Sequence, residues 1–205
     1  MIHPKTKLVY INDLVGYGLF ATEFIPEGTI TYVKDALEIE IPTSQLSKYK
    51  PEIRDNIEKY SYRDEKGNMV LSWDMGKYVN HCCTPNTIST GYGFEIAIRD
   101  IFEGEQVTDE YGIFNLEFEM MCECGSKNCR KIVQPDDFDN LYPKWDDQIQ
   151  QSIKKLKTVE QPLWAFLDEK VLNQLFELSK GIGKYRSVYT LRYKQLVRDL
   201  VSVKR

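Results

Sequence analysis

Hydrophobic residues in the first half of the chain occur in short runs separated by turn-forming residues. Pro26, Glu27 and Gly28 form one such turn signal between two runs. Short apolar or β-branched runs bounded in this way are typical of short β-strands. We expect strands over residues 8–10, 19–21, 29–33, 37–41, 69–73, 94–98 and 106–108.

Apolar residues at helical spacing occur over residues 44–60, where Pro51 marks a start or a break, and they dominate after Pro135. Residues 136–147 carry five aspartates and Pro143, which we interpret as a linker or surface loop. Three apolar stripes follow and predict helices with packing faces, the second of which ends at Gly181. Their members are Ile149, Ile153 and Leu156; Leu167, Val171, Leu175 and Leu178; and Tyr189, Tyr193, Leu196, Val197 and Leu200.

These patterns predict a β-rich α+β fold with a helical C-terminal extension. The 205 residues are 42% apolar, enough for a core in one domain plus an appendage, or in two small domains. No apolar run approaches the roughly 20 residues of a membrane span, and the first residues lack the apolar segment of a signal peptide. We therefore expect an intracellular protein with no membrane partner.

Five cysteines add a candidate metal site. Cys122, Cys124 and Cys129 form a C-x-C-x4-C cluster, and Cys82 and Cys83 lie about forty residues earlier. Structural zinc is bound by four ligands in a tetrahedron, so one thiolate of the earlier pair would complete the set. An odd number of cysteines suits zinc in a reducing compartment better than a disulfide framework.

The run NHCCTPN over residues 80–86 resembles the NHxCxPN signature of SET-domain protein lysine methyltransferases. Three further segments resemble that family in the same order, and the resemblance covers roughly residues 8–135. They are residues 16–22 (GYGLFAT), residues 98–112 (IRDIFEGEQVTDEYG) and residues 122–130 (CECGSKNCR), the last of which is similar to the post-SET zinc loop.

The resemblance implies a SET-domain fold of several small curled sheets with a knot-like C-terminal segment. It divides the chain into a SET domain (1–112), a post-SET zinc loop (113–135) and the helical extension (136–205). It also favours Cys83 over Cys82 as the fourth zinc ligand. The implied zinc ligands are Cys83, Cys122, Cys124 and Cys129.

The resemblance further implies that Tyr111 is the catalytic tyrosine and that the methyl donor is S-adenosylmethionine. The implied cofactor-binding residues are Gly16, Tyr17, Gly18, Asn80, His81 and Tyr111. Tyr32 and Tyr78 are candidates for the walls of the lysine channel. Outside these motifs, a tyrosine in a chain with 13 of them is more often a buried aromatic, and a Gly-x-Gly is more often a turn.

Two positions depart from the family pattern. Asp109 stands where relatives often have an aromatic residue two positions before the catalytic tyrosine, a residue that influences how many methyl groups are added. The number of methyl groups is therefore open. Glu110 replaces the usual aspartate.

The formal net charge of −4 hides an asymmetry, because residues 184–205 carry +6 and the rest of the chain −10. An acidic body suits a lysine-rich substrate segment. The basic segment is predicted to be a helix that packs by its apolar stripe with solvated cations. Contact of these cations with nucleic acid or a nucleosome, and a homodimer formed through the C-terminal helices, are the alternatives.

The leading hypothesis is a protein-lysine N-methyltransferase, with histone tails favoured as substrates. It predicts action in the nucleus or on chromosomes in a eukaryote, and in the cytoplasm or as a secreted effector in a bacterium. The alternative is a catalytically silent SET-fold zinc protein that acts in binding or as a scaffold. A zinc-dependent nucleic-acid binder is a third hypothesis, but the sequence lacks the common fingerprints of that class.

Overall fold

The computed structural model describes residues 1–194, which form five small β-sheets, three α-helices and short 3₁₀ helices. The strands are β1 (Thr6–Asn12), β2 (Gly16–Ala21), β3 (Ile30–Val33), β4 (Ile39–Ile41), β5 (Ser61–Arg63), β6 (Met69–Leu71), β7 (Asn80–His81), β8 (Thr87–Ser89), β9 (Phe94–Ala97), β10 (Thr108–Asp109), β11 (Met120–Met121) and β12 (Ile132–Val133). The helices are α1 (Pro51–Tyr60), α2 (Asp137–Ile153) and α3 (Glu169–Ser179), with 3₁₀ helices η1 (Thr43–Lys48), η2 (Met75–Tyr78), η3 (Tyr111–Ile113), η4 (Trp164–Phe166) and η5 (Val188–Leu191).

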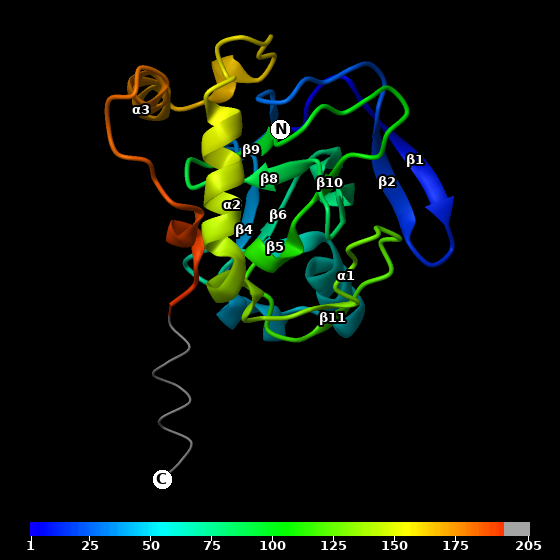
Figure 1. Ribbon diagram of the computed structural model, residues 1–205. Helices are drawn as coiled ribbons and strands as arrows, with labels where there is room; N and C mark the ends of the chain where they lie inside the picture. Colours follow the sequence, from blue (N-terminus) through cyan, green and yellow to red (C-terminus); the bar gives the residue numbers. More distant parts are fainter. Residues whose placement is uncertain (195–205) are drawn as a thin grey trace.

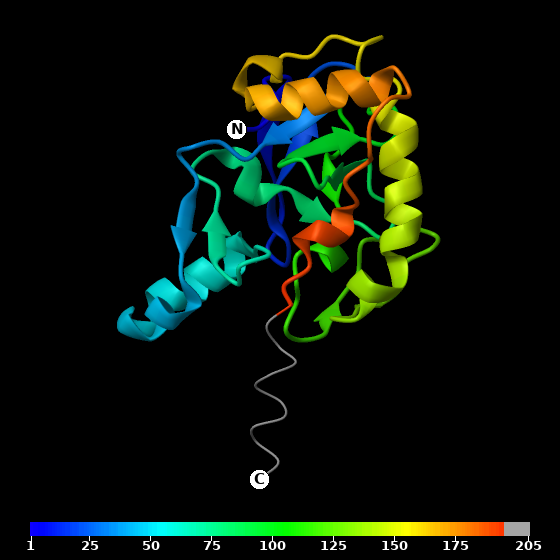
Figure 2. The ribbon, with the colours of Figure 1, turned by 90° about the vertical axis from the view of Figure 1, so that its left-hand side faces the viewer.

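The small sheets lie between the long helix α2 on one side and the projecting hairpin β1–β2 on the other (Figure 1). Turned by 90°, the molecule shows α3 across the top and α1 beside the sheet of β4, β5 and β6 (Figure 2). Each strand predicted from the sequence overlaps an observed strand. The turn signals located the strands because each apolar run is too short to form any other regular element.

The central antiparallel sheet has the order β3–β9–β8 and supplies most of one hydrophobic core. Its residues Ile30, Ile88 and Ile96 are fully buried. Phe138 and Ile149 of α2 are also fully buried and belong to the same core. The sheet and the extension therefore share one continuous apolar interior.

A second antiparallel sheet, β4–β6–β5, is covered by α1, which buries Ile57 against it. Pro51 is the first residue of α1, where its missing N–H is not needed. The predicted helical region over residues 44–60 is thus two helices, η1 and α1, that meet just before this proline.

The short strands β7 and β10 pair in parallel, which brings Asn80 and His81 beside the segment that leads to Tyr111. The fully buried Asn86 fixes this crossing. Its side-chain amide donates to the Gln106 carbonyl oxygen at 2.8 Å, and its Oδ1 accepts the Thr108 N–H at 2.8 Å. These bonds hold two segments that lie far apart in the sequence.

The linker or surface loop predicted over residues 136–147 is wrong, because α2 covers it from Asp137 onward, Pro143 included. Asp137 and Asp139 lie in the first turn, where carboxylates are favoured by the helix dipole. Asp146 accepts hydrogen bonds from the Tyr185 and Ser187 hydroxyls and so lies against the chain rather than in solvent. The acidic composition concealed a helix that is fixed by tertiary contacts.

The second predicted stripe is confirmed for Val171, Leu175 and Leu178, which lie in α3, and Gly181 follows the helix with φ of 72°. Its first member, Leu167, precedes α3 at the end of η4. The third stripe is only partly a helix. Residues 184–187 are not helical, and η5 forms a single turn with Val188 fully buried in the main core. The remainder of the predicted third helix, residues 195–205, lies outside the described residues.

Within residues 1–194, no helix combines the length and the apolar character that a bilayer span requires.

Candidate functional site

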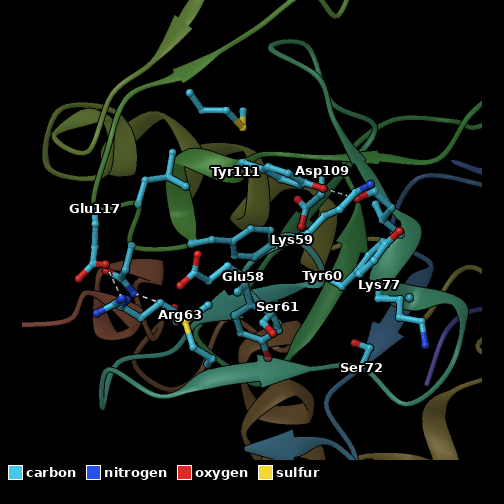
Figure 3. Close-up of a pocket in the computed structure, with 18 of the residues that line it drawn as sticks. Glu58, Lys59, Tyr60, Ser61, Arg63, Ser72, Lys77, Asp109, Tyr111 and Glu117 are labelled. Carbon is cyan, nitrogen blue, oxygen red and sulfur yellow. Dashed lines mark hydrogen bonds and ion pairs between the residues drawn. The ribbon is translucent and has the colours of Figure 1, made fainter. Parts of the chain in front are cut away.

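A cavity of about 410 Å³ opens between the end of α1 with β5 on one side and residues 114–120 on the other (Figure 3). Tyr111 and Asp109 lie at its inner end. The cavity is lined by residues from eight separate parts of the chain. They include Tyr32, Tyr60, Tyr62, Lys77, Val79, Glu95, Phe114, Glu117 and Met120.

Tyr111 is fixed by a hydrogen bond from its hydroxyl to the Val79 carbonyl oxygen at 2.6 Å. Its ring lies 5.5 Å from the His81 ring and 5.4 Å from the Phe114 ring. Burial raises the pKa of Tyr111, and the nearby Asp109 and Glu95 carboxyls raise it further. The hydroxyl therefore remains protonated. Its oxygen and the Val79 carbonyl oxygen lie next to each other at this end of the cavity.

The predicted wall residue Tyr32 lines the cavity, where its hydroxyl bonds Glu38 and Ser72. Tyr78 is packed beside the cavity, with its ring 5.9 Å from Tyr17 and 5.4 Å from Tyr60.

Sequence reasoning missed four aromatic wall residues: Tyr60, Tyr62, Phe114 and Phe118. Their segments resemble no motif, and only the fold brings them to the cavity.

The predicted glycine segment runs along the neighbouring hairpin. Asn80 Nδ2 donates to the Tyr17 carbonyl oxygen at 3.0 Å, so the segment is tied directly to β7. A Cβ on Gly18 would lie 2.6 Å from Gln106 Nε2 and 2.9 Å from Asn80 Nδ2, so a larger residue there would displace these side chains. The half-exposed Tyr17 ring and the close contact of Gly18 with Asn80 form an open face on the hairpin, next to β7. These features fit a flat heterocyclic cofactor.

His81 connects this face to the cysteine cluster. Its Nδ1 lies 3.2 Å from the Tyr111 nitrogen and 3.2 Å from the Asp109 carbonyl oxygen, and its Nε2 lies 3.3 Å from Cys83 Sγ. Burial, together with the Arg130 charge, lowers the pKa of His81 to about 4, so the ring is neutral. The imidazole thus contacts both the segment that carries Tyr111 and a cysteine sulfur.

The cysteines Cys83, Cys122, Cys124 and Cys129 converge, with all four Sγ atoms within 4.8 Å of one another. Cys122 Sγ lies 3.7 Å from Cys83 Sγ and 3.7 Å from Cys129 Sγ. A tetrahedron with Zn–S bonds of about 2.3 Å has edges of about 3.8 Å, so the donor set fits zinc. Cys82 lies outside the group, and its Sγ contacts Thr84.

Backbone N–H groups surround the sulfurs and favour thiolates. Arg130 N donates to Cys83 Sγ at 3.3 Å and Lys131 N to Cys129 Sγ at 3.4 Å. Burial alone would raise the pKa of Cys124, but N–H donors from Cys83 and Ser126 lower it to about 6. Metal ligation requires the deprotonated form, so this loop is prepared for a cation.

Arg130 joins the cysteine loop to the rest of the site. Its guanidinium bonds Glu110 Oε1 at 2.6 Å and Asp137 Oδ2 at 3.0 Å. Glu110 also accepts the Gly112 N–H at 2.8 Å and so caps η3, which carries Tyr111. The glutamate that departs from the family pattern is therefore a structural link between the loop, η3 and α2.

Asp109, which is buried, and Glu95, which is half-buried, form a carboxyl pair at the inner end of the cavity, and sequence reasoning missed Glu95. The two carboxyls are close enough that the charge of each affects the pKa of the other. Burial raises the pKa of Asp109 to about 7 and raises that of Glu95 well above its usual range. The Asp109 position was noted from its motif, but a glutamate on β9 carries no sequence signal.

Two cationic side chains of the basic C-terminal segment form hydrogen bonds with other parts of the chain. Arg186 bonds the Gly91 carbonyl oxygen and Gln174 Oε1, and Arg192 bonds Asp139 Oδ2 at 2.8 Å. These contacts agree with a packing role for residues 184–192.

Comparison with known proteins identifies the family. Residues 16–112 match the family model of the SET domain. The histone-lysine N-methyltransferase trr of Drosophila melanogaster is 29% identical over 135 residues, which are 58% of this chain and 5% of that protein. The H3 lysine-4 specific histone-lysine N-methyltransferase of Mycosarcoma maydis is 30% identical over 132 residues, 57% of this chain and 9% of that protein.

Among solved structures, the crystal structure of the methyltransferase domain of human histone-lysine N-methyltransferase SETMAR is similar, with a TM-score of 0.43 and 19% identity. The match covers 65% of this chain and 58% of the SETMAR chain.

The small sheets, the parallel pair β7–β10 and the match over residues 16–112 define a SET domain. The match confirms the predicted resemblance to SET-domain proteins for residues 16–112, and the predicted β-rich α+β fold class is confirmed. It spans less than a tenth of the length of the two curated relatives named above.

Proposed function

We propose that this chain is a protein-lysine N-methyltransferase that uses S-adenosylmethionine. The observation that carries the proposal is the Tyr111 hydroxyl, bonded to the Val79 carbonyl oxygen at the inner end of a cavity with aromatic walls. A neutral amine that enters this cavity meets an oxygen acceptor on each side. Such positioning of a nucleophile is a large part of what an enzyme contributes to a displacement reaction.

The cofactor supplies an electrophilic methyl group on a sulfonium. Gly16, Tyr17, Gly18, Asn80 and His81 would hold it on the open face of the hairpin, next to β7. The close backbone approach at Gly18 and the exposed Tyr17 ring support this assignment.

The walls of the cavity exclude water from the reacting amine. Tyr32, Tyr62 and Phe114 offer apolar ring faces to the aliphatic part of a lysine side chain. The Val79 and Tyr111 oxygens then orient the nitrogen through hydrogen bonds that favour one direction of its lone pair.

The four clustered cysteines would hold a structural zinc ion. Four thiolates close the tetrahedral shell and leave no position for a catalytic water. The bound ion would fix the loop over residues 122–130 against Cys83, and through Arg130 it would stabilise η3 and Tyr111.

Histone lysines are the favoured substrates, because similar proteins are named as histone-lysine methyltransferases. The acidic charge of the chain outside its last residues suits a lysine-rich segment. For a eukaryotic source this substrate implies action in the nucleus or on chromosomes, and for a bacterial source action in the cytoplasm or in a host cell. Lysine-rich proteins other than histones are the alternative substrates.

The proposal is tested with radiolabelled methyl donor, the purified chain, and either core histones or a whole-cell protein extract. We expect label in protein with the wild type and almost none with Tyr111→Phe. Calorimetry with S-adenosylmethionine distinguishes the enzyme from the alternative, a catalytically silent scaffold. A chain that binds no cofactor and transfers no label would be such a scaffold.

A further inference from the structure

The Glu95–Asp109 pair occupies the same space as the catalytic tyrosine. Glu95 lies on β9 and Asp109 on β10, and both line the cavity together with Tyr111. Asp109 is 1% exposed, and its carboxyl lies just below the Tyr111 ring and points into the cavity (Figure 3). The pair therefore faces whatever enters.

One carboxyl oxygen of Asp109 has no hydrogen-bond partner among the described residues. Asp109 Oδ1 accepts the Glu110 N–H at 2.7 Å, but Oδ2 receives no hydrogen bond of normal geometry from a donor in residues 1–194. In the same part of the chain, no cationic side chain forms an ion pair with either carboxyl. A buried acidic oxygen without a donor, aimed into a cavity, indicates a ligand that brings an N–H group.

Burial and the nearness of the two carboxyls disfavour the ionisation of both at once, so near neutral pH the pair holds one proton and carries a single negative charge. Burial of Asp109 raises its pKa to about 7, which allows the pair to take up a second proton in the physiological range. The titratable and polar groups around the two carboxyls are Glu38, Tyr62, His81, Glu110, Tyr111, the Met1 amino group and the neutral Ser89 hydroxyl.

We propose that Asp109, held by Glu95, is the base that takes a proton from the substrate ammonium at the inner end of the cavity, an inference that rests on the proposed function. An N–H bond of the ammonium breaks, and its proton passes to Asp109 Oδ2. The electron pair left on nitrogen forms the bond to the methyl carbon, and the pair of the methyl–sulfur bond remains on sulfur. The second proton then leaves the carboxyl pair to water.

The charges favour this step. An ammonium ion enters a cavity whose acid pair carries one negative charge, and after proton transfer both the amine and the pair are neutral. Fewer than about one free lysine amine in a thousand is neutral at pH 7. A positioned base removes this limitation, and general base catalysis typically contributes about 10²- to 10⁴-fold.

The test measures single-turnover methyl transfer from pH 5.5 to 10, with the extract protein that the wild type labels most strongly as the probe. The wild-type rate should rise through pH 7 and then level off. Asp109→Asn should lower the rate at pH 7 by about 10²-fold or more, and its rate should continue to rise toward pH 10 as the free amine loses its proton. Cofactor binding by calorimetry should be unchanged.

Glu95 is a positioning residue in this account, and two substitutions separate its hydrogen bond from its charge. Glu95→Gln keeps a donor to Asp109 and should retain a wild-type profile within a few fold. Glu95→Met has no donor, so the pKa of Asp109 should rise and the acidic limb of the profile should move to higher pH. Glu40→Gln changes an acid that pairs with Lys34 and does not line the cavity, and it should leave the profile unchanged.

A readout without substrate uses carbon-13 NMR of the side-chain carboxyls. Titration of Asp109 near pH 7 and of Glu95 above it would support the shared proton, whereas titration of both below pH 5 would overturn it. A wild-type pH profile in Asp109→Asn, or an unmoved limb in Glu95→Met, would equally overturn the inference. Absence of any label with the wild type would instead contradict the proposed function, so the two failures are distinct.

Discussion

At the scale of single residues, burial decides which side chains of the cavity carry charge. The Tyr111 hydroxyl and the Asp109 carboxyl are withdrawn from water, and both favour their neutral forms. Arg130 remains charged because Glu110 and Asp137 lie beside it. The inner end of the cavity therefore combines hydrogen-bonding oxygens with the single negative charge of the Glu95–Asp109 pair.

Tyr111→Phe should lower the methyl-transfer rate by about 10²-fold or more, because the hydroxyl that orients the amine is lost. Cofactor binding should change little, since the ring remains between His81 and Phe114. Tyr189→Phe, which removes a hydroxyl bonded to Asp139 outside the cavity, is the matched control. Wild-type turnover in Tyr111→Phe would show that the role is assigned to the wrong residue.

Asp109→Asn should stabilise the fold at neutral pH by about 1 kcal/mol or more while it removes activity. The unfolded carboxyl loses its proton near pH 4, and the folded one keeps it to about pH 7. The wild type therefore loses stability as pH rises through this window, and the asparagine variant does not. Thermal unfolding of both proteins at pH 4.5 and 7.5 measures this effect. A Tm difference between Asp109→Asn and the wild type that is equal at the two pH values would contradict it.

At the scale of elements, the site depends on segments that are too short to be stable alone. The loop over residues 122–130 has little apolar core, and the strands β11 and β12 that flank it have two residues each. Its order depends on the four sulfurs and on Arg130. The metal would supply the free energy that a hydrophobic core supplies elsewhere.

One zinc ion per chain is expected from elemental analysis of protein purified without chelators. Cys124→Ser should lose the metal and most of the activity, whereas Cys82→Ser should keep both, because Cys82 lies outside the cluster. Metal-free protein with full activity, or loss of zinc in Cys82→Ser, would show that the ligand set is misassigned.

Arg130→Met should destabilise the fold by about 3 kcal/mol, because it leaves Glu110 buried without its partner. Chemical denaturation measures the change. Adding Glu110→Gln to the same chain should recover part of the loss, since the uncompensated charge is then removed. Equal stability of Arg130→Met and the wild type would mean that water already screens this pair.

The elements also show where the sequence was informative. Turn signals located the strands, and the cysteine spacing located the metal loop. The aspartates before Asp147 read as a linker because composition cannot show that Asp146 accepts hydrogen bonds from residues about forty positions later. Glu95 and Tyr62 were missed for the same reason, since only tertiary structure brings them to Tyr111.

At the scale of the whole molecule, the extension is part of the core rather than an attachment to it. Val188 and Leu175 are buried in the same cluster as the central sheet. Arg186 and Arg192 hold residues 184–192 against the body through five hydrogen bonds from their guanidinium and backbone groups. These contacts weigh against nucleic acid as the partner of these two arginines.

Two truncations separate packing from nucleic-acid binding. Removal of residues 184–205 should destabilise the fold by several kcal/mol, because Val188 and the partners of Asp146 are lost. Removal of residues 195–205 alone should keep peptide methylation. Tight, salt-sensitive DNA or nucleosome binding by the intact chain, lost with residues 195–205, would overturn the preference for packing.

The central claim is that this SET domain methylates lysine, and mass spectrometry of the modified protein tests it most directly. Core histones and a whole-cell extract are incubated with S-adenosylmethionine and the purified chain, and the modified residues are mapped. The account predicts methyl groups on lysine side chains with the wild type and none above background with Tyr111→Phe. Cofactor binding without methylation of any lysine, or methyl groups on another residue type, would contradict it.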